Sequence, residues 1–480
     1  MLPFADESRA CRISQQAWSR LPLRDRLAPV ARFRRLLVSA ADRLCETVQR
    51  DIGRLPDEVL ATDVLPTADA CRFLQRNATN VLRPRHISLL DRPLWLFGER
   101  STVYRRAHGV VGIIGTWNYP IYLNAIQILQ ALTAGNGVLW KPSELMPACP
   151  AQLQELFQQA GYPPDLLRTL PATREAGSQL ADADVDHVVF TGSASVGRKL
   201  AARLGERLVS STLELSGCDA MFVMADADVP LAARAAWFGT TLNNGQTCLA
   251  VRRIFVQESV YAAFLQALEP LAMQARPVPL VLESQVKQAE QLVAQAVAAG
   301  ARPLANGNVV KSEIFPTIVC DAKPDMAICR EAAFAPIAAV LPFTEVEDAL
   351  RMDAQCGYAL GASIFSANTT KAQRLAARLG PGLVTINDTL AAAAHPATPF
   401  GGRGASGWGS TQGAEGLLAM TVPQAVSVRS GNFRPHYDPV AAAPHVAGIT
   451  RGVLELTHGT WRQRWTGLKR VLRQLPRFVR

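Results

Sequence analysis

The sequence predicts an α/β protein built around a doubly wound parallel sheet. Between residues 110 and 215, short apolar runs of strand length alternate with longer segments of helical periodicity. A repeated strand–helix order of this kind produces a parallel sheet that is covered by helices on both faces. At 480 residues the chain is too long for one ordinary hydrophobic core, so we expect at least two domains.

The expected elements follow one another in a regular order. A strand is expected at 110–115, then a turn, a helix over 121–132 and a second strand at 137–141. A helix at about 150–160, a short strand near 167–171, the strand VDHVVF, a helix over about 195–208 and the strand TLEL follow. Residues 109–140 contain no Asp, Glu, Lys or Arg, but their glycines and helically spaced amides favour separate elements over one membrane-spanning helix.

Composition narrows the class of protein. Hydrophobic residues make up 49% of the chain and charged residues 19%, which is typical of a globular protein and not of a disordered one. The nine cysteines show no CxxC pair and no zinc-finger spacing, so we expect reduced thiols, a cytoplasmic protein and no metal site. The amino-terminal residues lack the pattern of a secretion signal.

Part of the net charge of +10 is concentrated near the carboxyl end. Residues 451–480 carry seven arginines and Lys469 but only one acid, Glu455, and apolar residues are interleaved with these charges. Basic amphipathic segments of this kind bind anionic membrane surfaces. A solvated or packed helix explains the pattern as well, and both interpretations stay open. Because no recognition motif accompanies the charge, we expect no binding of nucleic acid.

Polar residues follow three of the expected strands directly. Asn118 follows the first strand, Lys141 and Glu144 lie at the end of the second, and Gly192 and Ser193 end the third, where a helix begins. Ligands of open α/β sheets bind beyond the carboxyl ends of the strands. A glycine before a helix lets a phosphate approach the free N–H groups of the helix. These three ends therefore predict a nucleotide site.

A GxGxxG pattern also occurs at 402–407. It follows ATPF instead of a convincing strand, and no acidic residue that could hold a ribose lies near position 427. We therefore do not expect this pattern to bind a dinucleotide.

Cys248 stands in an unusual context for a cysteine. Free cysteines are mostly buried, whereas this one follows the polar, turn-forming run NNGQT. Such a loop presents a thiol to a reactant, as a nucleophile requires.

The chain resembles the aldehyde dehydrogenase superfamily from before Gly109 to about Gly431. Seven blocks occur in the family's order and at similar intervals: GTWNYP, AGNGVLWKPSE, FTGSASVG, LELSG, NNGQTC, FAP and TPFGG. The resemblance implies oxidation of an aldehyde to its acid through a cysteine thiohemiacetal and a thioester, with NAD or NADP as hydride acceptor. It also implies two doubly wound parallel-sheet domains and a small oligomerisation arm.

The resemblance assigns three catalytic roles. Cys248 is the expected nucleophile, and the side-chain amide of Asn118 with the backbone N–H of Cys248 is the expected pair of oxyanion donors. Glu214 in LELSG is the expected base that activates water to hydrolyse the thioester. Relatives that pass the acyl group to coenzyme A generally lack this base, so Glu214 favours hydrolysis, with acyl transfer as a weaker alternative.

The resemblance also assigns cofactor contacts. They are Trp117, Lys141, Glu144, Gly192, Ser193, Gly197 and Phe334. An acidic residue beside the adenosine ribose disfavours a 2′-phosphate, so NAD is preferred and NADP remains the alternative.

One departure from the family pattern concerns the cofactor. The second acid that usually precedes the Phe-Gly-Pro block aligns with Ala332, which cannot hold the nicotinamide ribose, unless Glu331 substitutes for it. A different hypothesis follows from this substitution: a cofactor-poor relative that serves as a scaffold or an aldehyde-binding protein.

The resemblance implies a division of the chain. A cofactor-binding domain is expected at 1–217, with part of the oligomerisation arm near 95–108, and a catalytic domain at 218–410. A return segment with an oligomerisation strand is expected at 411–440 and a basic tail at 441–480. We expect a homodimer or homotetramer in the cytoplasm, with peripheral membrane contact through the tail as a hypothesis. The segments NDTL and GASG are similar to those of relatives that act on bulky hydrophobic or aromatic aldehydes.

Overall fold

A computed structural model describes residues 2–96, 98–305, 313–431, 437 and 444–474. The chain forms two compact units. The first comprises Met1–Leu82 and Arg106–Val422, and the second comprises Arg83–Arg105 and Pro423–Arg480.

The first unit contains a six-stranded sheet with the strand order β19-β7-β6-β3-β4-β5. Its strands are β3 (Val110–Ile114), β4 (Gly137–Lys141), β5 (Leu167–Thr169), β6 (His187–Gly192), β7 (Ser210–Leu215) and β19 (Gly407–Trp408). All neighbours are parallel except β19, which is antiparallel to β7. The five strands that the sequence predicted in this region are confirmed.

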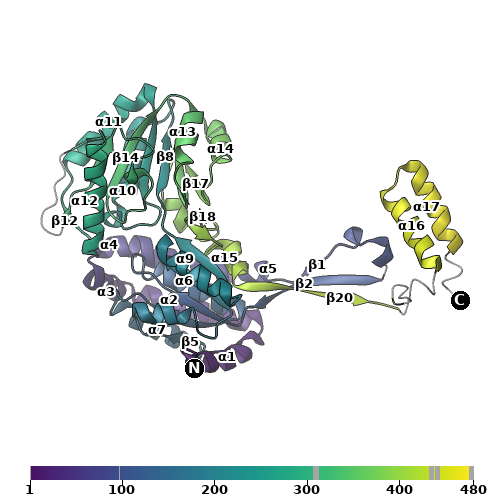
Figure 1. Cartoon of the computed structure of the whole chain (residues 1–480). Coiled ribbons are helices and arrows are strands. Elements are labelled where there is room, and N and C mark those ends of the chain that lie inside the picture. The colour runs from purple at the N-terminus through teal and green to yellow at the C-terminus, as the bar shows by residue number, and fades with distance from the viewer. Residues whose placement is uncertain (1, 97, 306–312, 432–436, 438–443, 475–480) are drawn as a thin grey trace. The chain divides into compact units, whose positions relative to one another are not determined.

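Helices cover both faces of this sheet (Figure 1). On one face lie α6 (Tyr122–Ala134) and α7 (Cys149–Gln159), which share a core with α2 (Leu23–Ser39), α3 (Ala41–Ile52) and α5 (Leu65–Val81). On the other face lie α8 (Arg174–Leu180) and α9 (Ala194–Glu206). Every residue of α6 is buried, which explains why residues 109–140 carry no charge. No helix of the described ranges is both long and apolar enough to cross a bilayer.

A second sheet in the same unit has seven strands in the order β11-β13-β14-β9-β8-β16-β17. They are β8 (Asp219–Val223), β9 (Val251–Gln257), β11 (Arg302–Pro303), β13 (Thr317–Cys320), β14 (Ile337–Phe343), β16 (Gly361–Phe365) and β17 (Leu383–Ile386). One face packs on α10 (Val229–Thr241) and α11 (Glu258–Met273). The other packs on α12 (Glu283–Ala298), α13 (Val346–Asp353) and α14 (Thr369–Ala376). The expected α/β fold with two doubly wound sheets is confirmed.

The register of the first sheet brings its polar strand ends together. Ile114 is paired with Lys141 on one side and with Phe190 on the other. On the next strand, Gly192 is paired with Leu215. Because these strands are parallel, the segments that follow β3, β4, β6 and β7 all leave from the same edge.

The last glycine of the GxGxxG pattern, Gly407, has a structural explanation. Gly407 has a φ of +94°, and a Cβ atom on it would lie 2.0 Å from the carbonyl oxygen of Leu213. Only glycine accepts both this conformation and this approach, so it allows β19 to pair with β7.

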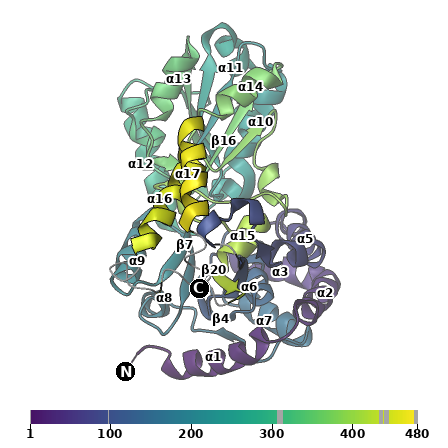
Figure 2. The same cartoon turned by 90° about the vertical axis from the view of Figure 1, so that its right-hand side faces the viewer.

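The second unit contains a three-stranded sheet and a pair of helices. The strand order is β1-β2-β20, with β1 (Arg85–His86), β2 (Glu99–Ala107) and β20 (Thr421–Arg429). The helices α16 (Pro444–His458) and α17 (Trp461–Gln474) pack side by side (Figure 2). Gly452 and Gly467 face each other where the two helices cross, and neither position has room for a Cβ atom. The basic tail is therefore helical over its described part, and residues 475–480 lie outside the described residues.

Candidate active site

Two cavities of the first unit meet at Cys248. Each has a volume of about 270 Å³. The first lies at the carboxyl edge of the six-stranded sheet, next to the segments after β3, β6 and β7. The second is enclosed mainly by apolar side chains. Leu123, Glu214 and Cys248 line both, so a reactant in either cavity can reach the same thiol and the same carboxyl group.

The run NNGQTC forms a turn that presents the thiol. Asn243, Asn244 and Gly245 all have positive φ values, of 53°, 54° and 71°. Asparagine and glycine are the residues that adopt this left-handed conformation most readily. A Cβ atom on Gly245 would lie 2.4 Å from the backbone of Ala335, so the turn also needs the missing side chain. Cys248, which follows this turn, is partly exposed, as the sequence predicted.

The surroundings of Cys248 do not favour its ionised form. Burial by the surrounding protein, and then the Glu214 and Asp219 carboxylates, hold the pKa of the Cys248 thiol well above its ordinary value. The thiol of the free protein therefore stays protonated at neutral pH and needs a base to become a nucleophile.

Glu214 lies in β7 and is 2% exposed. The Thr411 hydroxyl donates to Oε2 of Glu214 at 3.1 Å, while Oε1 has no hydrogen-bond partner among the described residues. Burial raises the pKa of Glu214 to about 7, and the hydrogen bond from Thr411 opposes this shift in part. The backbone N–H of Gly217 donates to the Cys248 carbonyl oxygen at 3.1 Å, which joins the segment after β7 to the cysteine loop. The site thus holds a carboxyl group that can exchange a proton near neutral pH.

Asn118 lines the first cavity and its side chain has a defined orientation. Its Oδ1 accepts a hydrogen bond from the Thr116 hydroxyl at 2.9 Å, and its Nδ2 donates to the carbonyl oxygen of Gln246 at 3.1 Å. Because an amide nitrogen carries two protons, one N–H remains for a ligand. This is the group that an oxyanion-binding role requires.

The structure brings together some of the expected cofactor residues but not all. Trp117, Gly192, Ser193 and Phe334 line the first cavity with the three catalytic candidates. The Trp117 and Phe334 rings meet edge-on with their centroids 6.1 Å apart. The Ser193 side chain accepts a hydrogen bond from the backbone of Val196 and so caps α9.

Three expected cofactor residues do not line that cavity. Gly197 faces Leu215, and a Cβ atom on it would lie 2.5 Å from that side chain, so this glycine lets α9 pack closely on β7. Lys141 and Glu144 form an ion pair of 3.0 Å after β4, and Arg174 binds the other oxygen of Glu144 at 2.8 Å. Partial burial works against ionisation of Glu144, but the hydrogen bonds from Arg174 and Lys141 outweigh it and lower the pKa of Glu144 to about 2.

The departure at Ala332 is visible in the structure. Ala332 lines the first cavity, where the acid of the family pattern would lie, whereas Glu331 is exposed and is not part of the cavity wall. Gln285 and Gln288 of α12 line the same cavity.

Comparison with known proteins identifies the family of this chain. The family model described as the aldehyde dehydrogenase family matches residues 6–426. The chain belongs to the aldehyde dehydrogenase family. Its activity is therefore the NAD(P)-dependent oxidation of an aldehyde.

The relatives differ in the substrates and cofactors that their names contain. A Methylomonas protein named 4,4'-diapolycopene aldehyde oxidase is 32% identical over 94% of this chain and 91% of its own length. A Mycolicibacterium smegmatis protein, provisionally named an NADP(+) succinate-semialdehyde dehydrogenase, is 31% identical over 87% of this chain and 82% of its own length. The crystal structure of a Mycobacterium tuberculosis aldehyde dehydrogenase complexed with NAD+ has a TM-score of 0.82 and 28% identity, covering 88% of this chain and 89% of that one.

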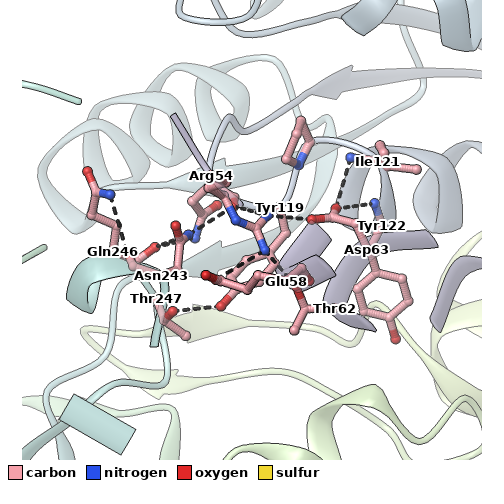
Figure 3. Close-up of polar contacts among 12 residues, drawn as sticks. Arg54, Glu58, Thr62, Asp63, Tyr119, Ile121, Tyr122, Asn243, Gln246 and Thr247 are labelled. Atoms are coloured by element: carbon pink, nitrogen blue, oxygen red, sulfur yellow. Dashed lines mark hydrogen bonds and ion pairs between the residues drawn. The ribbon is translucent and has the colours of Figure 1, made fainter. Parts of the chain in front are cut away.

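Residues outside the motifs of this aldehyde dehydrogenase also reach the active site. Thr411 contacts Glu214 from 197 residues away in the sequence. A buried polar network around Arg54 and Asp63 includes a hydrogen bond to the Asn118 carbonyl oxygen. Tyr119 joins the same turn to Thr247 of the cysteine loop (Figure 3). These residues could not be predicted from the sequence, because an isolated Arg, Asp or Thr outside a motif carries no signal of its role. Tyr119 is next to Asn118 in the block GTWNYP, and that position was the only available hint.

Proposed function

We propose that this aldehyde dehydrogenase oxidises a bulky, apolar aldehyde to its carboxylic acid with NAD as hydride acceptor. The observation that carries the proposal is the second cavity, which ends at Cys248. Its apolar wall consists mainly of Tyr119, Tyr122, Leu123, Phe238, Leu242, Leu249, Leu390, Phe400 and four alanines. A cavity with such walls binds a substrate by removing apolar surface from water.

The charge of this cavity argues against an acidic aldehyde. No Lys or Arg is among the described residues that line it, and the one ionisable carboxyl group there is Glu214. Succinate semialdehyde carries a carboxylate, which would lie in this cavity without a cationic partner and at a cost in desolvation. The name of the Methylomonas relative refers to an aldehyde of the polyene 4,4'-diapolycopene, and this supports the apolar alternative.

The chain's residues support a thioester mechanism. Cys248 Sγ adds to the aldehyde carbon while its proton passes to Glu214, whose pKa suits this transfer, and from there to solvent. The free N–H of Asn118 and the backbone N–H of Cys248 stabilise the oxyanion that forms. NAD, when bound, would accept the hydride, and the acyl group would then remain as a thioester on Cys248. Oε1 of Glu214 then takes a proton from the water that attacks this thioester and passes it to the Cys248 sulfur as the acid is released.

The first cavity contains groups that fit a dinucleotide. The free N–H groups at the start of α9 and the Ser193 hydroxyl suit a phosphate, while Trp117 and Phe334 suit an aromatic ring. Glu144 is ionised and would repel the 2′-phosphate of NADP, which supports NAD. Lys141 is expected to lie near the same ribose. Ala332 leaves the nicotinamide end with one hydrogen bond fewer than the family pattern.

The division of the chain follows as part of the proposal. The six-stranded sheet supports a cofactor domain at 1–217, and the seven-stranded sheet supports a catalytic domain at 218–410. Val422, Val426 and Val428 of β20 are exposed, and an exposed edge of this kind is suited to a second copy of the chain. A homodimer or homotetramer is therefore expected, and light scattering of the purified protein would show a monomer if this is wrong.

The helical tail supports peripheral membrane contact. Trp461, Trp465 and Leu472 of α17 are exposed, and the same helix carries five Lys and Arg residues. Sedimentation with anionic and neutral vesicles tests this contact with the full chain. Binding to anionic vesicles should fall when Trp461 and Trp465 are both replaced by serine, and unchanged binding would count against the hypothesis.

An aldehyde panel tests the proposed reaction. Short, long, aromatic and acidic aldehydes are compared by NADH formation and by identification of the product, with and without coenzyme A. Long apolar aldehydes should give the highest kcat/KM, and the product should be the free acid. Cys248→Ala should abolish turnover, and Glu214→Gln should slow both the first burst of NADH and the later turnovers, because glutamine can accept a proton neither from the thiol nor from water. Turnover by Cys248→Ala, or a preference for succinate semialdehyde, would overturn the proposal.

A further inference from the structure

Arg54 and Asp63 form an ion pair that is buried beneath the active site. The Arg54 side chain is 3% exposed and the Asp63 side chain 0%, and the guanidinium donates to Oδ2 of Asp63. Neither residue lines either cavity. A buried ion pair loses so much hydration that it is weak evidence for a contribution to stability. Its contacts with other groups therefore show better what the pair does.

The pair holds both ends of the turn that carries Asn118. Nη1 of Arg54 donates to the Asn118 carbonyl oxygen at 3.0 Å. Oδ1 of Asp63 accepts from the backbone N–H groups of Ile121 at 3.0 Å and of Tyr122 at 2.9 Å, where α6 begins (Figure 3). One rigid charged pair therefore fixes residues 118–122 at two separate points.

The same turn is attached to the cysteine loop. Asn243 Nδ2 donates to the Asn118 carbonyl oxygen at 3.1 Å, so this oxygen is shared with Arg54. The Tyr119 hydroxyl and the Thr247 hydroxyl are 2.7 Å apart, directly before Cys248. The Arg54 guanidinium carbon lies 4.7 Å from the centroid of the Tyr119 ring. Arg54 thus contacts both residues through which the turn reaches the loop.

We propose that Arg54, held by Asp63, is a positioning residue that fixes the oxyanion-binding amide of Asn118 relative to the Cys248 thiol. The proposal rests on the proposed catalytic roles of Asn118 and Cys248. Arg54 does not touch the substrate and acts through Asn118. Without the Arg54 guanidinium, the turn that carries Asn118 can shift relative to the cysteine loop. The Asn118 amide then no longer lies where the oxyanion forms.

Lysine at position 54 tests this proposal with the full chain. Arg54→Lys keeps the charge but cannot reach Asp63 and the Asn118 carbonyl with the same planar group. We expect kcat to fall by roughly tenfold to a hundredfold, because small displacements of catalytic groups have effects of that size. KM should change less than kcat, because Arg54 lines neither cavity and reaches the wall of the second only through Thr62 and Tyr119. The rate of the first NADH burst should fall with kcat.

A double-mutant comparison separates positioning from a general loss of structure. In an Asn118→Ala background, Arg54→Lys should cause little further loss, because the group that it positions is absent. Arg253→Lys is the matched control: it changes a buried arginine of β9 that pairs with Asp353 of α13 and lines neither cavity. This control should leave kcat within about twofold of wild type, because the hydrogen-bond partners of Arg253, Cys218 and Asp353, are not shared with Arg54 or Asn118.

Each outcome decides one of the two proposals. If Arg54→Lys retains the kcat of wild type, Arg54 is not a positioning residue for this amide. The same conclusion follows if the fold-losses in kcat of Arg54→Lys and Asn118→Ala multiply in the double variant. If Asn118→Ala itself retains full activity, the proposed role of Asn118 fails instead. Should Arg54→Lys not fold, Asp63→Asn provides the second variant, because it keeps the acceptor for Ile121 and Tyr122 and removes the charge that orients Arg54.

Discussion

Glu214 and Thr411 form a hydrogen bond of 3.1 Å that occupies one carboxyl oxygen and leaves the other available. The available oxygen belongs to a residue that lines both cavities together with Cys248. Thr411 therefore orients the proposed base without blocking it. Several properties of Glu214 follow from this arrangement and from its burial.

Turnover should depend on the ionisation of Glu214. Its pKa is about 7, and only the ionised form accepts a proton from water. When hydrolysis limits the rate, kcat should rise about tenfold per pH unit below the pKa and level off above it. A pH–rate profile checks this, with Glu214→Gln as the variant that should lack the inflection. An inflection near the ordinary glutamate pKa would contradict the assignment.

Removal of the Thr411 hydroxyl should move this inflection. The hydrogen bond from Thr411 lowers the pKa of Glu214, so Thr411→Val should shift the inflection upward, by about one pH unit. Thr411→Ser keeps a hydroxyl and should leave the profile close to that of wild type. A profile that moves downward in Thr411→Val would show that the hydrogen bond does not favour the ionised form.

Burial of Glu214 should also reduce stability at high pH. Its pKa in the folded protein, about 7, is above its ordinary value of 4.5, so the folded state binds this proton more tightly. This contribution to stability is complete below the ordinary pKa and is lost as the pH rises through the pKa of the folded state. As the pH rises from 4.5 to about 7, the free energy of unfolding of Glu214→Gln should therefore increase by up to about 3 kcal/mol relative to that of wild type. Urea unfolding across this range measures the gain, and a difference that does not vary with pH would refute it.

The alanines of the second cavity should set the size of the substrate. Ala393 lines this cavity, and a phenylalanine in its place would fill part of a volume of only about 270 Å³. Ala393→Phe should lower kcat/KM for long or aromatic aldehydes by tenfold or more, because lost or strained contacts cost roughly 1–3 kcal/mol. The kcat/KM for short aldehydes should change little. Ala298, at the end of α12, lines neither cavity, and its replacement by phenylalanine is the control. Equal losses for all aldehydes would mean that the cavity does not hold the substrate's tail.

Glu144 should determine the preference for NAD over NADP. Its ionised carboxylate, held by Lys141 and Arg174, repels an additional phosphate. Glu144→Gln removes this charge, so the kcat/KM ratio of NADP to NAD should rise, by about tenfold. Glu155→Gln, at an exposed ion pair with Arg43, should leave the ratio unchanged. No change in Glu144→Gln would place the adenosine ribose elsewhere.

The local patterns of the chain predicted the fold because each acts over a short stretch of sequence. Fully apolar runs such as Val110–Ile114 are what a strand buried on both faces requires. The run NNG predicted a turn because asparagine and glycine accept positive φ values, and all three residues have them. The polar strand ends meet at one edge because parallel strands share a direction.

Long-range contacts decided the rest. Arg54 lies in the loop after α3 and Asp63 in a short helical turn, both outside any motif. Their role depends on a turn that begins 64 residues after Arg54. The pKa of Glu214 depends on burial and on Thr411, and the apolar character of the second cavity depends on side chains from six separate segments. The order of apolar and turn-forming residues determined which elements form and which thiol is presented, because those preferences are local. Tertiary structure alone decided how the carboxyl group, the amide and the thiol are held together, because desolvation and hydrogen bonding act between groups that only the folded chain brings into contact.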